Sequence, residues 1–89
     1  MANIESQKKR NRQNEKRRQR NQAIRSEIRT RTKHALSAAE AGDASGAAEM
    51  LTIAQQRIDT ATTKGVLHRR TAARRKSRLT RQVADLLGS

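Results

Sequence analysis

The sequence has no cysteine, no proline and no aromatic residue, and these absences exclude several kinds of protein. Without cysteine the chain has neither a disulfide framework nor a thiolate metal site. Without Phe, Tyr or Trp it lacks the rings on which the bases of a single strand usually stack. No apolar run approaches the roughly 20 residues that a membrane span needs, and the N-terminus lacks the apolar core of a secretory signal. We therefore expect a soluble, cytoplasmic protein.

Large apolar residues are also scarce, so the core must be small. Apart from Met1, the 89 residues include only fourteen Ile, Leu, Val and Met side chains. The length suits a single domain over residues 1–89, but a core of this size is marginal for that length. A partner that binds only the folded chain would supply the missing stability by mass action.

Positive charge is what the sequence has in excess. It has 21 Lys and Arg against 8 Asp and Glu, a formal net charge of +13. Residues 1–34 hold twelve basic and three acidic groups, residues 35–64 hold two and four, and residues 65–89 hold seven and one. The charge gathers at the two ends of the chain, which indicates a nucleic acid or an anionic membrane surface rather than a substrate pocket.

The most basic stretch, residues 8–33, predicts a long helix. It has twelve Lys and Arg against two acids and contains no Gly or Pro, and Arg, Lys, Gln and Glu all favour helices. We expect a helix over residues 6–41, with Asn3 or Ser6 as its N-cap and Gly42 as its stop. An apolar stripe enters only in its second half, at Ile24, Ile28, Ala35 and Ala39.

The first half of this helix carries cations all round its surface. That pattern suits phosphates that approach from several directions, as in a folded RNA, better than a flat membrane or one side of a DNA groove. Like charges also repeat four residues apart, for example at Lys8 and Arg12, and each such pair costs about 0.2–0.5 kcal/mol. We therefore expect this half to be frayed or disordered alone and to become ordered on binding; the alternative is a charged tail that stays solvated.

Two shorter helices are expected over residues 43–64 and 68–87, with Asp43 as a cap and Gly65 as a stop. The first has a heptad-like seam made of Ala44, Ala47, Leu51, Ala54, Ile58 and Ala61. The second has an apolar face of Ala72, Leu79, Val83 and Leu86 and, opposite to it, an arginine face of Arg70, Arg74, Arg78 and Arg81. Short turns make neighbouring helices antiparallel. The predicted fold is all-α, a three-helix up-down-up bundle whose long, basic N-terminal helix overhangs its partners.

Residues typical of catalysis or metal binding form no recognisable pattern. His34 and His68 are the only histidines, and neither belongs to a His-Glu-x-x-His motif or to a similar ligand spacing. The sequence also lacks a glycine-rich phosphate loop. We therefore expect no enzymatic activity, no metal, no cofactor and no small-molecule substrate, and a surface or phosphate-facing role for both histidines.

Several short motifs follow one another along the whole chain. They are Met1-Ala2-Asn3-Ile4, Ser6, Lys8-Lys9-Arg10, Arg25-Ser26, Arg29-Thr30, Lys33, Ile58-Asp59, Lys64-Gly65, His68, Ala72-Ala73-Arg74 and Lys76-Ser77-Arg78-Leu79. In this order they resemble the bacterial small-subunit ribosomal protein family number twenty. The resemblance implies a three-helix bundle with an extended first helix, which binds small-subunit ribosomal RNA directly and assists its folding during subunit assembly.

The resemblance places RNA-facing positions within residues 6–33 and 64–78, and the arginine face extends them to Arg81. The candidate RNA-binding residues are Ser6, Lys8, Lys9, Arg10, Arg12, Asn14, Lys16, Arg17, Arg18, Arg20, Asn21, Arg25, Arg29, Lys33, Lys64, His68, Arg70, Arg74, Arg75, Arg78 and Arg81. The segment Arg69-Arg70-Thr71 departs from the Lys-Asn-Lys of many members, so no contact of that Asn is carried over.

Two other functions are compatible with the charge. One is a basic DNA-binding or nucleoid-associated protein, but a basic-region dimer needs Leu heptads directly after its basic region, where this chain has Ile24, Ile28 and a turn at Gly42. The other is a protein of an anionic membrane surface, which the all-round charge disfavours. We expect a protein of the ribosome, away from membranes, that is not a homo-oligomer and that can neighbour other small-subunit proteins.

Overall fold

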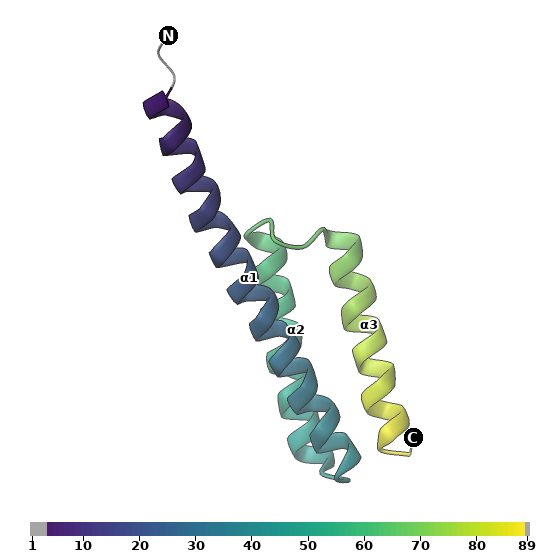
Figure 1. Cartoon of the computed structure of the whole chain (residues 1–89). Coiled ribbons are helices and arrows are strands. Elements are labelled where there is room, and N and C mark those ends of the chain that lie inside the picture. The colour runs from purple at the N-terminus through teal and green to yellow at the C-terminus, as the bar shows by residue number, and fades with distance from the viewer. Residues whose placement is uncertain (1–3, 89) are drawn as a thin grey trace.

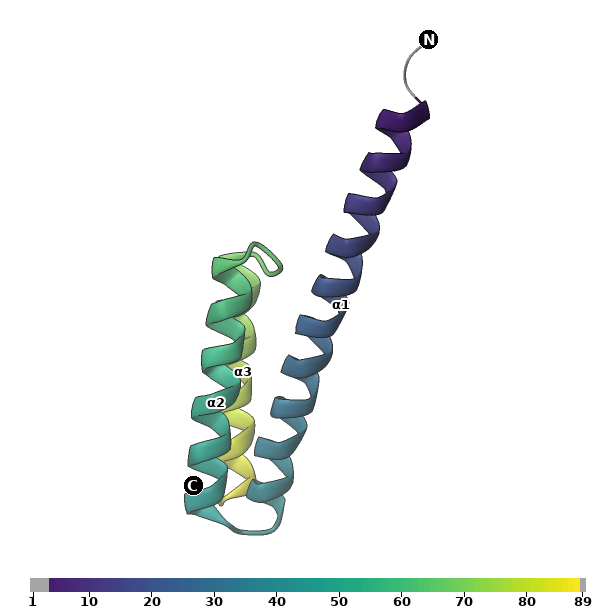
Figure 2. The ribbon, with the colours of Figure 1, turned by 90° about the vertical axis from the view of Figure 1, so that its left-hand side faces the viewer.

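The computed structural model describes residues 4–88, which form three α-helices joined by two turns. In chain order they are α1 (Ile4–Glu40), α2 (Ala44–Thr63) and α3 (Arg69–Leu86). In Figure 1, α2 runs back along the second half of α1, and α3 runs in the opposite direction to α2. Figure 2 shows the N-terminal half of α1 extending past the ends of the other two helices. The predicted all-α, up-down-up bundle with an overhanging first helix is confirmed.

Both ends of α1 differ slightly from the predicted ones. The helix begins at Ile4, so Ser6 lies inside its first turn and is not the N-cap, while the other candidate, Asn3, lies outside the described residues. At the other end Gly42 has a left-handed φ of 76°, and its backbone N–H donates to the carbonyl of Ala39 at 3.0 Å. This is the glycine-terminated helix end that the sequence predicted.

The other two helices each start one residue later than predicted, because the predicted first residue is a cap. Asp43 accepts a hydrogen bond of 2.9 Å from the backbone N–H of Gly46, the third residue of α2. A Cβ atom on Gly46 would collide with this Asp43 carboxylate, so the glycine leaves room for the cap. His68 caps α3 similarly, since its Nδ1 accepts from the N–H of Arg70 at 3.1 Å.

Gly65 ends α2 with a φ of 77° and turns the next two residues into the core. The N–H of Val66 donates to the carbonyl of Ala61 at 2.9 Å, which is the six-to-one bond of this kind of helix end. Val66 and Leu67 are each only 7% exposed. The sequence pattern assigned neither of them to the core, because they lie between helices and outside any helical period.

The core is thin and forms two clusters, in which half of the buried residues are alanine. The cluster near the α2–α3 turn contains Ile28, Ile58, Ala61, Val66, Leu67 and Ala72. The second cluster contains Ala35, Ala39, Ala47, Ala54, Leu79 and Val83. Two predicted core positions were wrong: Ala44, the first residue of α2, is exposed, and Leu86, the last residue of α3, is 44% exposed. Ala44 lies at the N-terminal end of α2, before the core begins. At the end of α3, Leu87 rather than Leu86 packs against the second cluster, one helical turn after the buried Val83.

The first half of α1 has no packing partner in the bundle. All of residues 4–20, which we call the overhang, are exposed, whereas Asn21 is half-buried and Ile28 is buried. At 1.5 Å per residue the overhang is about 25 Å long. It carries eight Lys and Arg and two Glu. In the part of the chain that the structure describes, no helix is both long and apolar enough to cross a membrane.

Candidate nucleic-acid interface

The overhang is a rod of exposed cations whose side chains make only local interactions. Arg18 Nη2 lies 2.7 Å from Glu15 Oε1, and Arg18 Nε donates to Glu15 Oε2 at 3.1 Å. These hydrogen bonds lower the pKa of the Glu15 carboxyl and raise the pKa of Arg18. The other cations of the overhang form no ion pair with an acid in residues 4–88, so their charge is available to an external anion.

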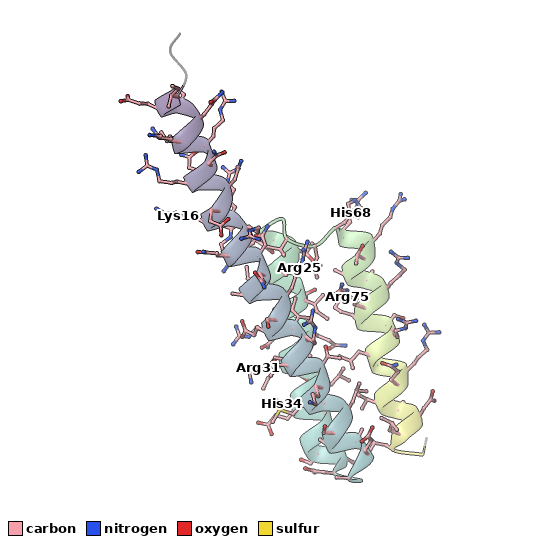
Figure 3. All side chains as sticks on the ribbon, in the orientation of Figure 1. Lys16, Arg25, Arg31, His34, His68 and Arg75 are labelled. Carbon is pink, nitrogen blue, oxygen red and sulfur yellow. The ribbon has the colours of Figure 1, made fainter. Side chains whose placement is uncertain are left out.

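A second basic surface covers the outer side of α3. Its four arginines, Arg70, Arg74, Arg78 and Arg81, are all exposed, and a shallow groove runs along most of them. At the start of the helix, the Nδ1 atom of His68 accepts the N–H of Arg70, so the exposed ring has only Nε2 left for a ligand. Figure 3 shows His68 at the end of α3 that lies on the side of the overhang.

A cleft of about 300 Å³ lies between α1 and α3. Its floor is apolar and consists of Ile28, Ile58 and Leu79. Its rim carries four arginines, Arg25 and Arg29 from α1 and Arg75 and Arg78 from α3. In Figure 3, Arg25 and Arg75 lie on the sides of the two helices that face each other. No acidic side chain is among the residues that line this cleft.

The other two helix–helix seams are each closed by an ion pair. Between α1 and α2, Arg57 Nε lies 3.1 Å from Glu27 Oε1. Between α2 and α3, Lys76 Nζ lies 2.7 Å from Asp59 Oδ1. Within residues 4–88, no ion pair joins α1 to α3. The bundle therefore has two seams in which opposite charges meet and one, the cleft, that carries positive charge alone.

A groove along one flank of α1 connects the overhang with the cleft. It is lined by Asn14, Arg17, Arg18, Asn21, Gln22, Arg25, Ser26 and Arg29. Because Arg25 and Arg29 also stand on the rim of the cleft, positive charge is continuous from the overhang to α3. Beneath this flank the Oδ1 atom of Asn21 is buried with no hydrogen-bond partner in the described part of the chain.

All the candidate RNA-binding residues lie in the described part of the chain, and all but the half-buried Asn21 are exposed. The structure brings four of them, Arg25, Arg29, Arg75 and Arg78, from two distant segments to one cleft. It leaves Lys33 and Lys64 outside this cleft, on the exposed surface of α1 and at the C-cap of α2. The contacts of these residues with RNA stay a prediction.

Sequence reasoning missed two polar residues of the cleft, Thr32 and Gln82. Thr32 follows Arg29 by one helical turn, and Gln82 follows Arg78 by one helical turn. This spacing places each of them on the same helix face as a predicted RNA-binding arginine and could have identified them. The chemistry of the cleft favours anions, because guanidinium groups donate hydrogen bonds and carry positive charge. No group of three His, Cys, Asp or Glu side chains that could hold a metal ion occurs among residues 4–88.

Comparison with known proteins decides the family. Residues 2–84 match the family described as ribosomal protein S20. The chain belongs to the ribosomal protein S20 family. A protein of Frankia casuarinae named small ribosomal subunit protein bS20 is 49% identical over 89 residues, which are 100% of both chains. A Corynebacterium efficiens protein of the same name is 52% identical over 81 residues, 91% of this chain and 93% of the relative.

A third S20 relative, from Mycobacterium tuberculosis, has the same name and is 46% identical over 86 residues, 97% of this chain and 100% of its own. Membership in the S20 family confirms the resemblance that the sequence motifs suggested. It also agrees with the prediction that the chain is a structural protein and not an enzyme, since the family is one of ribosomal proteins. The overhang, the arginine face and the cleft are therefore surfaces of an S20 protein.

Proposed function

We propose that this S20 protein is a structural component of the small ribosomal subunit that binds small-subunit ribosomal RNA directly. The observation that carries the proposal is the overhang: residues 4–20 expose eight Lys and Arg and bury nothing. A helical segment of this kind gains no stability from the core of its own chain, so a polyanion must neutralise it. The relatives, which are named small ribosomal subunit proteins, indicate which polyanion that is.

The shape of the charge favours structured RNA over a flat or one-sided partner. Cations surround the overhang, so phosphates can reach it from several directions, as they do between the helices of a folded RNA. Lysine and arginine side chains would contact phosphates and fix the position of the helix, while amides such as those of Asn14 and Gln22 can reach ribose hydroxyls and base edges. The arginine face of α3 would hold the bundle against a second RNA segment.

Binding of this kind stabilises both partners. RNA phosphates would attract the cations of the overhang and offset the repulsion between them. The helix and the RNA would then each stabilise the ordered form of the other. A protein that binds only the folded RNA stabilises that fold by mass action, which is how the chain would assist assembly. We expect it to act as a single copy on the ribosome in the cytoplasm, beside other small-subunit proteins.

Competition binding at one salt concentration tests the proposal. A labelled small-subunit RNA transcript bound to the protein is challenged with unlabelled transcript, with duplex DNA, or with anionic vesicles, at equal concentrations of phosphate. We expect the unlabelled transcript to displace the labelled transcript far better than duplex DNA or vesicles do. Equal displacement by duplex DNA would support a nucleoid-associated protein instead.

The salt dependence of binding is a second measurement. If roughly ten phosphates are contacted, a plot of the logarithm of the binding constant against the logarithm of the salt concentration should have a slope of about −7 to −9.

A further inference from the structure

We infer that the cleft between α1 and α3 clamps one backbone phosphate of the bound RNA between arginines of the two helices. The inference rests on the proposed RNA binding and assigns the chemical group that enters the cleft. It makes the RNA a structural part of the bundle, because an anion held there joins α1 to α3.

Charge is the first argument for the clamp. Each of the other two seams pairs a cation with a carboxylate, Glu27 with Arg57 and Asp59 with Lys76. The α1–α3 seam has four arginines on its rim and no carboxylate among its lining residues. A phosphodiester supplies the negative charge that this seam lacks. Its two free oxygens also match the planar fork of a guanidinium group, which binds them through two parallel hydrogen bonds.

The shape of the cleft is the second argument. Its volume of about 300 Å³ is at the lower end of the range for ligand sites, so it suits one nucleotide unit of a strand and not the groove of a duplex. Its floor contains Ile28, Ile58 and Leu79, whose exposed fractions are 2%, 1% and 2%. Because these three side chains are almost fully buried, a ribose would rest mainly on the carbon stems of the rim arginines, while Thr32 and Gln82 offer a hydroxyl and an amide to the ribose hydroxyls.

The position of the cleft is the third argument. Arg25 and Arg29 line both the cleft and the groove along α1. A strand that follows the overhang is therefore led by continuous positive charge to the place where α3 faces α1. The same phosphate contacts would then fix the direction in which the overhang leaves the bundle.

Paired variants separate a clamp from diffuse attraction. The cleft variant combines Arg29→Gln with Arg75→Gln, and its matched control combines Arg70→Gln with Arg74→Gln, which removes the same charge from the outer face of α3. Affinity for the small-subunit RNA transcript is measured for both. The clamp predicts that the cleft variant loses at least about tenfold more affinity than the control, because it removes charged hydrogen bonds to one group. Equal losses in the two variants would overturn the clamp.

A second pair of variants keeps the charge and changes the geometry. Replacing Arg75 and Arg78 by lysine should also weaken RNA binding, because an ammonium group cannot form the bidentate contact. The same replacement at Arg70 and Arg74 should weaken RNA binding less, because an ammonium group keeps the charge that attracts a phosphate on an open surface. Wild-type affinity in the Arg75→Lys and Arg78→Lys double variant would contradict the clamp.

A readout without RNA distinguishes failure of the clamp from failure of the proposed function. Inorganic phosphate is titrated into the whole protein while the side-chain N–H signals of its arginines are followed by NMR. We expect saturable shifts at Arg29 and Arg75 that the cleft variant lacks, and no such shifts at Arg70. Absence of saturable shifts at the cleft would overturn the clamp. A wild-type protein that binds phosphate there and yet prefers duplex DNA to ribosomal RNA would overturn only the proposed function.

Discussion

Arg25 Nη2 donates a hydrogen bond of 3.5 Å to the carbonyl oxygen of Val66, and this contact ties the middle of α1 to the turn between α2 and α3. Val66 is buried in the same core cluster as Ile28, and Ile28 follows Arg25 by one turn of α1. Before this point the residues of the overhang are all exposed. The contact therefore marks where α1 leaves the bundle, between a half held by the core and a half that needs an external partner.

Ile58→Ala should destabilise the free protein strongly. Ile58 is 1% exposed and is the large side chain most completely buried in the described chain. Its truncation should cost about 2–5 kcal/mol in the free energy of unfolding, which is a large part of the stability of a small domain. Urea unfolding without RNA measures this loss. Ile4→Ala is the control, since Ile4 is 68% exposed and its truncation should change stability by less than about 0.5 kcal/mol.

The overhang is helical throughout in the structure; in solution we expect it to fray until RNA binds, so that RNA increases its helix content. Its like charges repel one another, each pair costing about 0.2–0.5 kcal/mol, and no core contact of residues 4–20 offsets this. Circular dichroism of the protein with and without the small-subunit transcript, corrected for the RNA signal, should show more helix in the complex. Equal helicity in the two states would rule out coupled folding.

Glu15→Gln should raise the affinity for RNA. Hydrogen bonds from Arg18 hold the pKa of the Glu15 carboxyl below its usual value of 4.5, so at neutral pH this group is charged, repels phosphates and occupies Arg18. Filter binding at fixed salt compares the two proteins. A lower affinity in the variant would mean that Glu15 holds Arg18 in position for the RNA.

The same pair should respond to acid in a defined direction. A carboxyl with a lowered pKa stabilises the ordered state above its usual pKa and loses this contribution as the pH falls through the lowered value. Circular dichroism of the wild-type protein and of the Glu15→Gln variant is measured against pH, and the difference between the two helix signals gives the contribution of Glu15. This contribution should stay constant near neutral pH and fall only below about pH 4.5. A change near neutral pH would contradict the lowered pKa of Glu15.

His68 allows a structural role to be separated from a binding role. Its Nδ1 atom caps α3, and asparagine is a good N-cap as well. His68→Asn should keep the stability of the free protein, whereas His68→Ala should lose about 0.5–2 kcal/mol. If the imidazole contacts RNA, both variants should bind the transcript more weakly. An unchanged affinity in His68→Asn would leave His68 with its capping role alone.

The architecture could be predicted because the relevant signals are local. Gly42 and Gly65 have the positive φ values that end helices, and the spacing of Ile28, Ala35 and Ala39 placed one face of α1 in the core, where all three are buried. Asp43 was recognised as a cap from its residue type alone. Signals of this kind depend on neighbours along the chain, so the sequence contains them.

The rest depends on which segments meet in space. Val66 and Leu67 enter the core because the chain turns sharply after Gly65, and no periodic pattern marks residues in a turn. In the sequence, two separate basic surfaces were expected to hold the arginines of the cleft, one with Arg25 and Arg29 and the other with Arg75 and Arg78. Only the packing of α3 beside α1 brings them to one cleft, and this packing follows from the whole bundle and not from either segment.

Chemical footprinting of small-subunit ribosomal RNA tests the central claim most directly. The transcript is probed alone, with the wild-type protein, and with a variant in which Lys16 and Arg20 of the overhang are replaced by glutamine. The account predicts a discrete set of nucleotides protected by the wild-type protein, part of which loses protection with the variant while the remainder, under the bundle, stays protected. Uniform weak protection, or the same footprint for both proteins, would contradict it.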